Sequence, residues 1–515
     1  MPLGRTYAVS LVGLNGHIIE VEADIGQTLP AFVILGLPDA SLNEARDRIR
    51  AGARNAGLPL SRRKITVNLI PASLHKRGSG FDLAIVMAAL AATGEVRRCG
   101  NTVFIAEVGL DGRLRPISGV LPAVMAGVKA GHTRFVVAAG NHGEAALVPQ
   151  AEVKGFASLA EVFLAFGADP TKVSLPDTPT DPVQAPLPPN PGNRQPAIKD
   201  MADIAGQPAA RFAVEIAAAG AHHMMMVGPP GAGKTMLVER MPGILPDLTD
   251  QEAMEVTAIH SLGRVLSCHG LQRRPPFESP HHTSSTASII GGGSGIPRPG
   301  AASRAHRGVL FLDEAPEYQR GVLEALREPL ESGELVLHRS AGTASYPARF
   351  QLVMALNPCP CGLASGKGID CVCTAEQRRR YFNRLSQPLL DRVDLQLAVA
   401  RVSLADYSDG ARAESSAVVA ARVAAARAAQ RERLAKWGAN TNAEMPSSVL
   451  NEGLKLPRAV TAPVDKAMNN ETLTMRGHDR VLRVAWTLAD LGGQSSPTTH
   501  DVEVALNLRL QESAS

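Results

Sequence analysis

The sequence predicts an α/β protein with three folded parts: an N-terminal α/β domain, a second α/β domain built on a parallel sheet, and a C-terminal helical domain. Three observations support this fold class. A proline-rich stretch at 170–196 separates the first part from the rest. An apolar strand at 222–228 then runs into a glycine loop and a helix. From about residue 415 the sequence is rich in alanine and arginine, with helical spacing.

Composition and charge indicate a globular protein. The 515 residues suffice for two or three domains, and 45% of them are hydrophobic and 20% charged. No apolar run reaches the roughly 18 residues that cross a bilayer, and the first residues lack a signal-peptide pattern, so we expect a cytoplasmic protein without membrane contact. A net charge of +4 does not by itself indicate nucleic acid, so any basic surface must be local.

The elements follow in order along four segments. We divide the chain into a first domain at 1–168, a linker at 169–197, a second domain at 198–400 and a helical domain at 401–515. In the first domain we expect a hairpin at 7–25, a helix at 43–57, a strand at 64–71 and a buried helix at 81–94. A helix at 209–220 opens the second domain. Helical spacing at 417–437, 478–493 and 499–510 predicts the last domain.

The glycine loop of the second domain fits the phosphate-binding pattern G-x-x-x-x-G-K-[ST] in full, and it stands between a strand and a helix as that motif requires. Glycines let backbone N–H groups face phosphates. We expect Lys234 to reach the β- and γ-phosphates of ATP and the Thr235 hydroxyl to bind Mg²⁺. The loop comprises Gly228, Pro229, Pro230, Gly231, Ala232, Gly233, Lys234 and Thr235.

Two further strands end in polar residues. Residues 308–314 read GVLFLDE, which predicts that Asp313 binds Mg²⁺ and that Glu314 polarises the attacking water. A strand at 350–356 ends in Asn357, which could hold that water against the γ-phosphate. Each pattern alone also fits a structural role, as a common strand end or as a turn asparagine before proline. The order of the three strands favours the catalytic interpretation.

These motifs together resemble an AAA+ ATPase, and longer segments are similar to its magnesium-chelatase-like branch, the ComM (YifB) family. The resemblance covers nearly the whole chain. The segments are DIAGQ at 203–207, PHHTSSTASIIGGGSGIPRPGAASRAHRGVLFLDE at 280–314, YPARFQLVMALNPCPCG at 346–362 and RLSQPLLDRVDL at 384–395. The resemblance implies a hexameric ring in which Arg392 reaches the γ-phosphate of a neighbouring subunit and Arg483 is the second sensor of the lid. Without the resemblance, either arginine would read as a surface charge.

Several basic segments are candidates for DNA contact. Residues 334–350 read as a hairpin with His338 and Arg339 near its turn, and related rings place such a hairpin in the central pore. His338 and Arg339 are therefore candidates, together with Arg298 and Arg304 of the glycine-rich insert. A solvated loop is an equal alternative. Arg378, Arg379 and Arg380 precede two aromatic residues and suit a nucleic-acid strand, although a solvated helix face explains them as well.

The cysteines and histidines suggest at most one metal site. Four cysteines, Cys359, Cys361, Cys371 and Cys373, lie within fifteen positions and could hold one structural Zn²⁺, the alternative being four reduced thiols. The adjacent His281 and His282 diverge as neighbours do, so we assign them to loop structure.

Two segments of the first domain, at 76–94 and 107–131, resemble the proteolytic domain of Lon-type proteases, which uses a serine and a lysine. Ser79 matches the serine position, but the lysine position falls on Leu121. A serine without a base is a poor nucleophile, and only Lys76 and Lys129 are near in sequence. We therefore expect a scaffold that builds the ring or guides substrate.

Three functions remain open at this point. The first is a hexameric DNA motor that uses ATP for branch migration or unwinding in recombination or DNA uptake. The second is a protein-remodelling motor of the chelatase type, and the third is an ATP-dependent protease that relies on Ser79.

Overall fold

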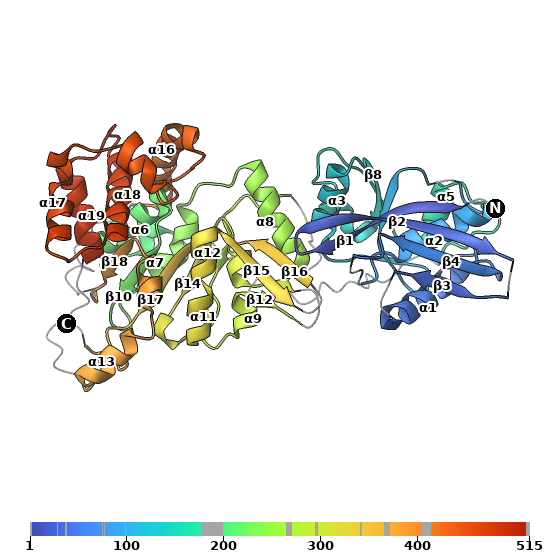
Figure 1. Cartoon of the computed structure of the whole chain (residues 1–515), viewed down its shortest axis with the longest axis horizontal. Helices are drawn as coiled ribbons and strands as arrows, with labels where there is room; N and C mark the ends of the chain where they lie inside the picture. The colour runs from blue at the N-terminus through green and yellow to red at the C-terminus, as the bar shows by residue number, and fades with distance from the viewer. Residues whose placement is uncertain are drawn as a thin grey trace.

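A computed structural model of the chain describes residues 3–27, 29–36, 39–74, 76, 78–97, 99–176, 199–263, 270–293, 297–339, 342–364, 371–402 and 414–510. Most of the predicted linker, residues 177–198, lies outside this set. The N-terminal domain, the central domain and the C-terminal helices follow one another along the long axis of the molecule (Figure 1).

The N-terminal domain is built on a seven-stranded sheet with the order β3-β4-β2-β1-β5-β8-β9. The predicted hairpin is confirmed: β1 and β2 pair antiparallel, and Gly13 supplies a φ of +65° in their turn. Strands β1, β5, β8 and β9 run parallel to one another. The strands are β1 (Gly4–Val12), β2 (Asn15–Gly26), β3 (Phe32–Leu35), β4 (Lys64–Ile70), β5 (Thr102–Ile105), β8 (Arg134–Ala138) and β9 (Glu152–Phe156), beside a short ribbon of β6 (Glu107–Val108) and β7 (Leu114–Arg115).

Two hydrophobic cores, one on each face, cover this sheet. The first contains α2 (Asp82–Thr93), which is buried along nearly its whole length, with α1 (Asp39–Asn55) and α5 (Leu159–Ala165). The second contains α3 (Val120–Lys129) and the short α4 (His142–Ala145). The all-apolar composition of 83–92 therefore reflects a helix enclosed in a core, as the sequence predicted.

The central domain holds a five-stranded sheet in the order β11-β14-β17-β10-β18, and every pair in it is parallel. Successive side chains of a strand point to opposite faces, so Met224 and Met226 enter one core and Met225 the other. Burial on both faces explains why these strands read as unbroken apolar runs. The strands are β10 (Met224–Val227), β11 (Phe277–Glu278), β14 (Val309–Leu312), β17 (Gln351–Leu356) and β18 (Leu395–Ala398).

Helices and two hairpins surround the central sheet. One face packs on α6 (Pro208–Gly220) and α7 (Lys234–Arg240), and the other on the insert before β14 and on the segment between β14 and β17. The remaining elements are α8 (Asp250–Gly263), α9 (Thr286–Ile289), β12 (Gly291–Gly292), β13 (Arg298–Pro299), α10 (Ala301–Arg304), α11 (Arg320–Ala325), α12 (Arg327–Ser332), β15 (Glu334–Arg339), β16 (Gly342–Pro347), α13 (Ala375–Phe382) and α14 (Gln387–Leu390).

The C-terminal domain is helical, as predicted, and comprises α16 (Ser416–Leu434), α17 (Arg458–Asn469), α18 (Met475–Leu491) and α19 (Thr499–Leu510). Helix α18 begins three residues before the predicted 478 because the Thr474 side chain accepts a hydrogen bond from the Gly477 N–H at 3.1 Å and caps the helix earlier. Helices α16 and α18 pack on α6, so the domain forms a lid on one side of the central sheet.

A buried carboxylate fixes the lid to the sheet. Asp394, just before β18, forms an ion pair with Arg480 of α18 and accepts the backbone N–H of His223 at 2.9 Å. Burial by itself raises the pKa of Asp394, but Arg480 and the two neighbouring histidines hold that pKa well below its usual value. The carboxylate is therefore charged in the fold.

The N-terminal domain contacts the central domain through α3 and α8. The Gly119 N–H donates to the Ser261 carbonyl at 2.9 Å, and the Ser261 hydroxyl donates to the buried carboxylate of Glu144. Among the described residues, no helix combines the length and the apolar character that a membrane crossing needs.

Candidate active site

Three glycines shape the loop between β10 and α7. Gly231 and Gly233 adopt φ values of +77° and +82°, the left-handed region that favours glycine. A Cβ on Gly228 would lie 2.3 Å from the carbonyl oxygen of Val399, so a side chain there would collide with the chain that follows β18. The sequence pattern is thus required by the shape of the loop, which presents backbone N–H groups as phosphate-binding loops do.

Lys234 lies under this loop and is 8% exposed. Its Nζ donates to the carbonyl oxygens of Gly228 at 2.6 Å and Pro229 at 3.1 Å, and to Asn357 Oδ1 at 3.3 Å. Burial lowers the pKa of this ammonium, and the carboxylates of Asp313 and Glu314 partly oppose that shift. The lysine therefore joins the glycine loop to the end of β17.

Thr235 and Asp313 meet across the ends of β10 and β14. The Thr235 hydroxyl donates to Asp313 Oδ2 at 2.8 Å. Two neighbouring ligands of an octahedral Mg²⁺, each at about 2.0–2.1 Å, lie about 2.9 Å apart, so these two oxygens fit adjacent positions on one ion. The residues present therefore suit the magnesium that the sequence predicted.

Glu314 occupies a left-handed backbone conformation, with a φ of +51°, and its side chain is half exposed. Its N–H donates to Asp313 Oδ1 at 3.0 Å, so the two acids share one turn. The Glu314 carboxylate lies 3.2 Å from Nδ1 of His282. The sequence assigns His282 to loop structure, and it lies there in a turn before α9. From that turn, 32 residues before Glu314 in the chain, its ring contacts the predicted base.

The strand order explains how these residues come together. β17 lies between β10 and β14, so Asn357 follows a strand that separates the glycine loop from the two acids. The carboxyl ends of parallel strands share one edge of the sheet, where α/β proteins bind ligands. The predicted nucleotide-binding residues, which come from three distant segments, are therefore assembled at one edge.

The two predicted arginines lie away from this edge. Arg392 forms an ion pair with Glu331 and donates to the Pro388 carbonyl oxygen. Arg483 donates from Nε to the Met445 carbonyl oxygen at 2.9 Å, within the lid. Burial lowers the pKa of both guanidinium groups. No bond to the glycine loop is described for either, so their roles stay predictions.

The candidate DNA-contacting residues differ in exposure and in the partners of their side chains. Arg298 is exposed on β13, and His338 is exposed on β15, where its Nδ1 lies 3.0 Å from Thr343 Oγ1. Arg304 is engaged: its guanidinium bonds to Glu278 at 2.9 Å and 3.2 Å. The Arg339 side chain lies outside the described residues.

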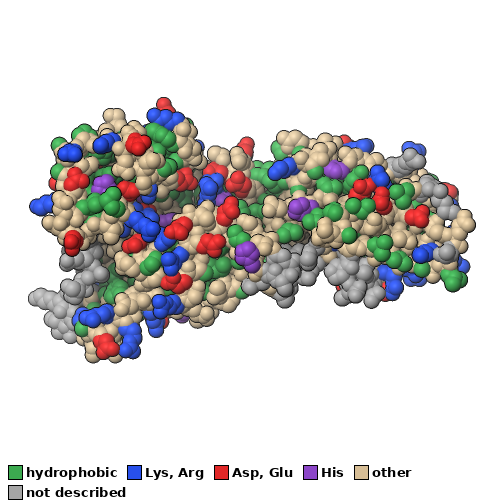
Figure 2. Space-filling view, viewed as in Figure 1, with side chains coloured by type: hydrophobic (Ala, Val, Ile, Leu, Met, Phe, Trp, Pro, Cys, Tyr) green, Lys and Arg blue, Asp and Glu red, His purple; other side chains and the backbone are tan. Residues whose placement is uncertain are grey.

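The two hairpins that carry these residues pack together, because the Tyr346 hydroxyl donates to the Pro297 carbonyl oxygen. Arg379 and Arg380 are exposed on α13. Several Lys and Arg side chains gather at the end of the molecule where α13 lies (Figure 2).

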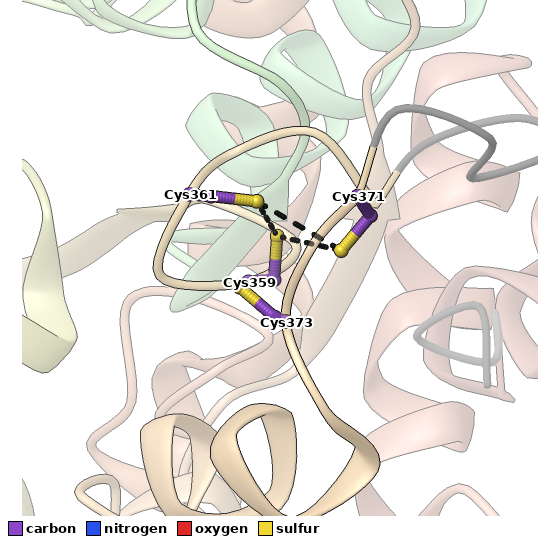
Figure 3. Close-up of side chains that lie close together, drawn as sticks. All are labelled: Cys359, Cys361, Cys371 and Cys373. Atoms are coloured by element: carbon purple, nitrogen blue, oxygen red, sulfur yellow. Dashed lines mark hydrogen bonds between the residues drawn. The ribbon is translucent and has the colours of Figure 1, made fainter.

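The structure brings the four cysteines into one cluster (Figure 3), although they come from two segments. All four sulfur atoms lie within 4.8 Å of one another, Cys359 is buried and the other three are half-buried. The separations include 3.2 Å between Cys359 and Cys361 and 3.8 Å between Cys361 and Cys371. The donor set is that of a tetrahedral metal site.

The N-terminal domain places Ser79 against a carboxylate. Its hydroxyl donates to Glu107, a residue that the sequence reasoning missed. Lys76 is buried and donates to the carbonyl oxygens of Pro71 and Leu74, and Leu121 is buried in the second core. Thus Lys76 is held by backbone rather than by the serine.

Known family models match all three folded parts of the chain. Residues 200–407 match the family described as magnesium chelatase, subunit ChlI; residues 21–141 match subunit ChlI of Mg-chelatase; and residues 413–509 match the C-terminal part of subunit ChlI. The three matches cover the central domain, most of the N-terminal domain and the lid, respectively.

Relatives align along almost the entire chain. An uncharacterised protein of Mycobacterium tuberculosis is 47% identical over 99% of both chains. Competence protein ComM of Haemophilus influenzae is 38% identical, over 99% of this chain and 98% of that protein. The YifB protein of Escherichia coli is 38% identical, over 99% and 97%. The chain therefore belongs to the ComM (YifB) family of magnesium-chelatase-like AAA+ ATPases.

Proposed function

We propose that this ATPase is a ring-shaped motor, a homo-hexamer, that binds DNA and remodels it by unwinding or branch migration. The observation that carries the proposal is the nucleotide site at one sheet edge, in a chain that aligns end to end with a protein named for competence, the uptake of DNA. Recombination and DNA uptake are the processes that such a motor would serve.

The site residues divide the chemistry of ATP hydrolysis among them. Lys234 neutralises phosphate oxygens, and Thr235 and Asp313 hold Mg²⁺, which supplies positive charge to the phosphates when bound. Glu314, beside Asp313, orients and polarises the attacking water. Asn357, already bonded to Lys234, holds the attacking water against the γ-phosphate. Arg483 would sense the nucleotide from the lid.

The ring explains the position of Arg392. A guanidinium that adds to the γ-phosphate of a neighbour stabilises the charge of the transition state, and such a residue must stand away from its own glycine loop. Mixing Arg392→Ala subunits with Lys234→Ala subunits should restore turnover at the interfaces that pair an intact site with an intact arginine. Mixtures with no more activity than the separate variants would contradict a trans role.

DNA contact is supported by the paired hairpins. Arg298 and His338 are exposed on hairpins that pack together, and Arg379 and Arg380 are exposed on α13. Each phosphate neutralised by an arginine makes binding more sensitive to salt, by a slope of about 0.9 for duplex DNA. Arg298→Ala should therefore lower the salt slope by about one, whereas the exposed lid variant Arg458→Ala should leave it unchanged.

The deciding experiment is the steady-state ATPase rate with and without single-stranded, duplex and branched DNA, at low and moderate salt. Stimulation that falls with salt is the result expected of a DNA motor. The second candidate function, a chelatase-type motor that remodels protein, is favoured by the family matches to subunit ChlI. An ATPase rate that no DNA form changes would support that function instead.

An ATP-dependent protease is the third candidate. The Ser79 hydroxyl bonds to Glu107, while Lys76 donates to backbone carbonyls. Ser79→Ala should leave ATP hydrolysis and DNA stimulation unchanged.

A further inference from the structure

The four cysteines close a loop that starts and ends at the nucleotide site. The chain leaves the sheet after Asn357, turns through Cys359 and Cys361, and returns through Cys371 and Cys373 into α13. A capping box of Thr374 and Gln377 fixes the start of α13 directly after the last cysteine. The cluster thus joins the segment that leaves the sheet after Asn357 to the segment that leads into α13.

All four sulfur atoms lie within 4.8 Å of one another, and two of their separations match the edge of a tetrahedral metal site. A Zn–S distance of about 2.3 Å places two sulfur ligands about 3.8 Å apart, the edge of the tetrahedron. Cys361 and Cys371 are 3.8 Å apart, and Cys371 and Cys359 are 3.7 Å apart. A disulfide requires about 2.05 Å, well below even the 3.2 Å between Cys359 and Cys361. The Ala364 N–H also points to Cys359 Sγ at 3.3 Å, as expected around a thiolate.

Two contacts connect this loop to the residues that bind ATP. Gly362, at a φ of +77°, approaches the glycine loop so closely that a Cβ would lie 2.7 Å from the ring of Pro230. On the other side of the loop, Tyr381 of α13 is buried, which raises the pKa of its hydroxyl to about 12, and the backbone of Asn357 lies near enough to that hydroxyl to oppose the shift. The segments on either side of the cysteine cluster therefore lie against both the phosphate loop and the end of β17.

We propose that the four cysteines bind zinc and that this metal acts as a brace for the nucleotide site, so that losing it weakens nucleotide binding and ATP hydrolysis. The inference rests on the ATPase role of the site and not on DNA as the substrate. Without the metal, the two cysteine pairs no longer hold Gly362 and Tyr381 in place. The contacts of Gly362 with Pro230 and of Tyr381 with Asn357 are then no longer fixed. A shift of about 1 Å in catalytic groups can cost about a hundredfold in rate.

Variants can test the metal site and the contact between Gly362 and Pro230 separately. Cys371→Ser and Cys373→Ser should each lower the zinc content of the purified full-length protein from about one per chain toward zero. They should also lower the ATPase rate and the affinity for a fluorescent ATP analogue by about tenfold or more. Gly362→Ala keeps all four thiolates but places a methyl group against Pro230, so it should keep its zinc and still lose about tenfold in rate. Val372→Ala, at an 84% exposed position between two ligands, should change neither quantity.

Metal analysis, nucleotide affinity and basal ATPase rate are measured without DNA, so an absence of DNA stimulation leaves this inference standing. The intrinsic fluorescence of Trp437 and Trp486, both in the lid, shows whether the lid of each variant is folded. Wild-type protein purified in reducing buffer with added zinc that contains none would overturn the metal site. Folded cysteine variants that lose zinc but keep nucleotide affinity and rate within about twofold would overturn the brace.

Discussion

The ion pair between Asp394 and Arg480 provides a quantitative test of how the lid is held. The Asp394 side chain is 1% exposed and the Arg480 side chain 18%, so water screens this pair little. Removing one partner of a buried pair leaves an uncompensated charge and typically costs about 3–5 kcal/mol. We expect Asp394→Asn to lower the free energy of unfolding of the lid and central sheet by about 3 kcal/mol.

Intrinsic fluorescence can follow this unfolding selectively. The chain has two tryptophans, Trp437 and Trp486, and both belong to the C-terminal domain. Urea titrations of the wild type, Asp394→Asn, Arg480→Gln and the double variant form a double-mutant cycle, in which a direct contact gives a coupling of about 1–3 kcal/mol. Single effects that add to within about 0.5 kcal/mol would show that the pair does not stabilise the lid. Arg458→Ala, exposed on α17, is the matched control.

Three further predictions concern the nucleotide site and pH. Lys234→Ala should abolish detectable ATP binding in a fluorescent-nucleotide titration, because the ammonium under the loop is lost, whereas Lys199→Ala on the surface should bind normally. Glu314→Gln should bind ATP with wild-type affinity but hydrolyse it at least about a hundredfold more slowly in a single-turnover assay; rapid turnover would mean that another residue activates the water. Burial lowers the pKa of His223 from 6.5 to about 4, and its Nδ1 accepts the Leu352 N–H at 3.0 Å. Because the unfolded chain takes up this proton more readily, the contribution of His223 to stability is present above pH 6.5 and is lost as pH falls toward 4. In urea titrations, the free energy of unfolding of His223→Asn should therefore fall less between pH 7 and pH 4.5 than that of the wild type.

Much of the fold was predictable because local patterns agreed with the tertiary structure. The hairpin at 7–25, the buried helix at 81–94 and the strand before the glycine loop follow from periodicity and from turn residues. Helix ends were less predictable, since α18 begins where the Thr474 side chain caps it. Capping depends on side-chain geometry that periodicity does not contain.

Part of the candidate site was predictable for the same reason. A phosphate-binding loop and its acidic partner carry their chemistry in short contiguous motifs, so Lys234, Thr235 and Asp313 could be identified directly. His282 and Glu107 could not, because each was brought into view only by its contact with a residue far away in sequence, Glu314 and Ser79 respectively. A lone histidine or glutamate in a loop has no local pattern that distinguishes these partners from surface residues.

The fold class, the phosphate-binding loop and the grouping of the cysteines could be inferred from the residues alone, because each depends on positions close together in the chain. The contacts between distant groups became known from the folded structure. The strand order places Asn357 between the glycine loop and the acids. Arg304 bonds to Glu278, and Gly362 packs against Pro230. The physical reason is that strand order and close packing bring together segments separated by scores of residues, and no local propensity specifies those pairings.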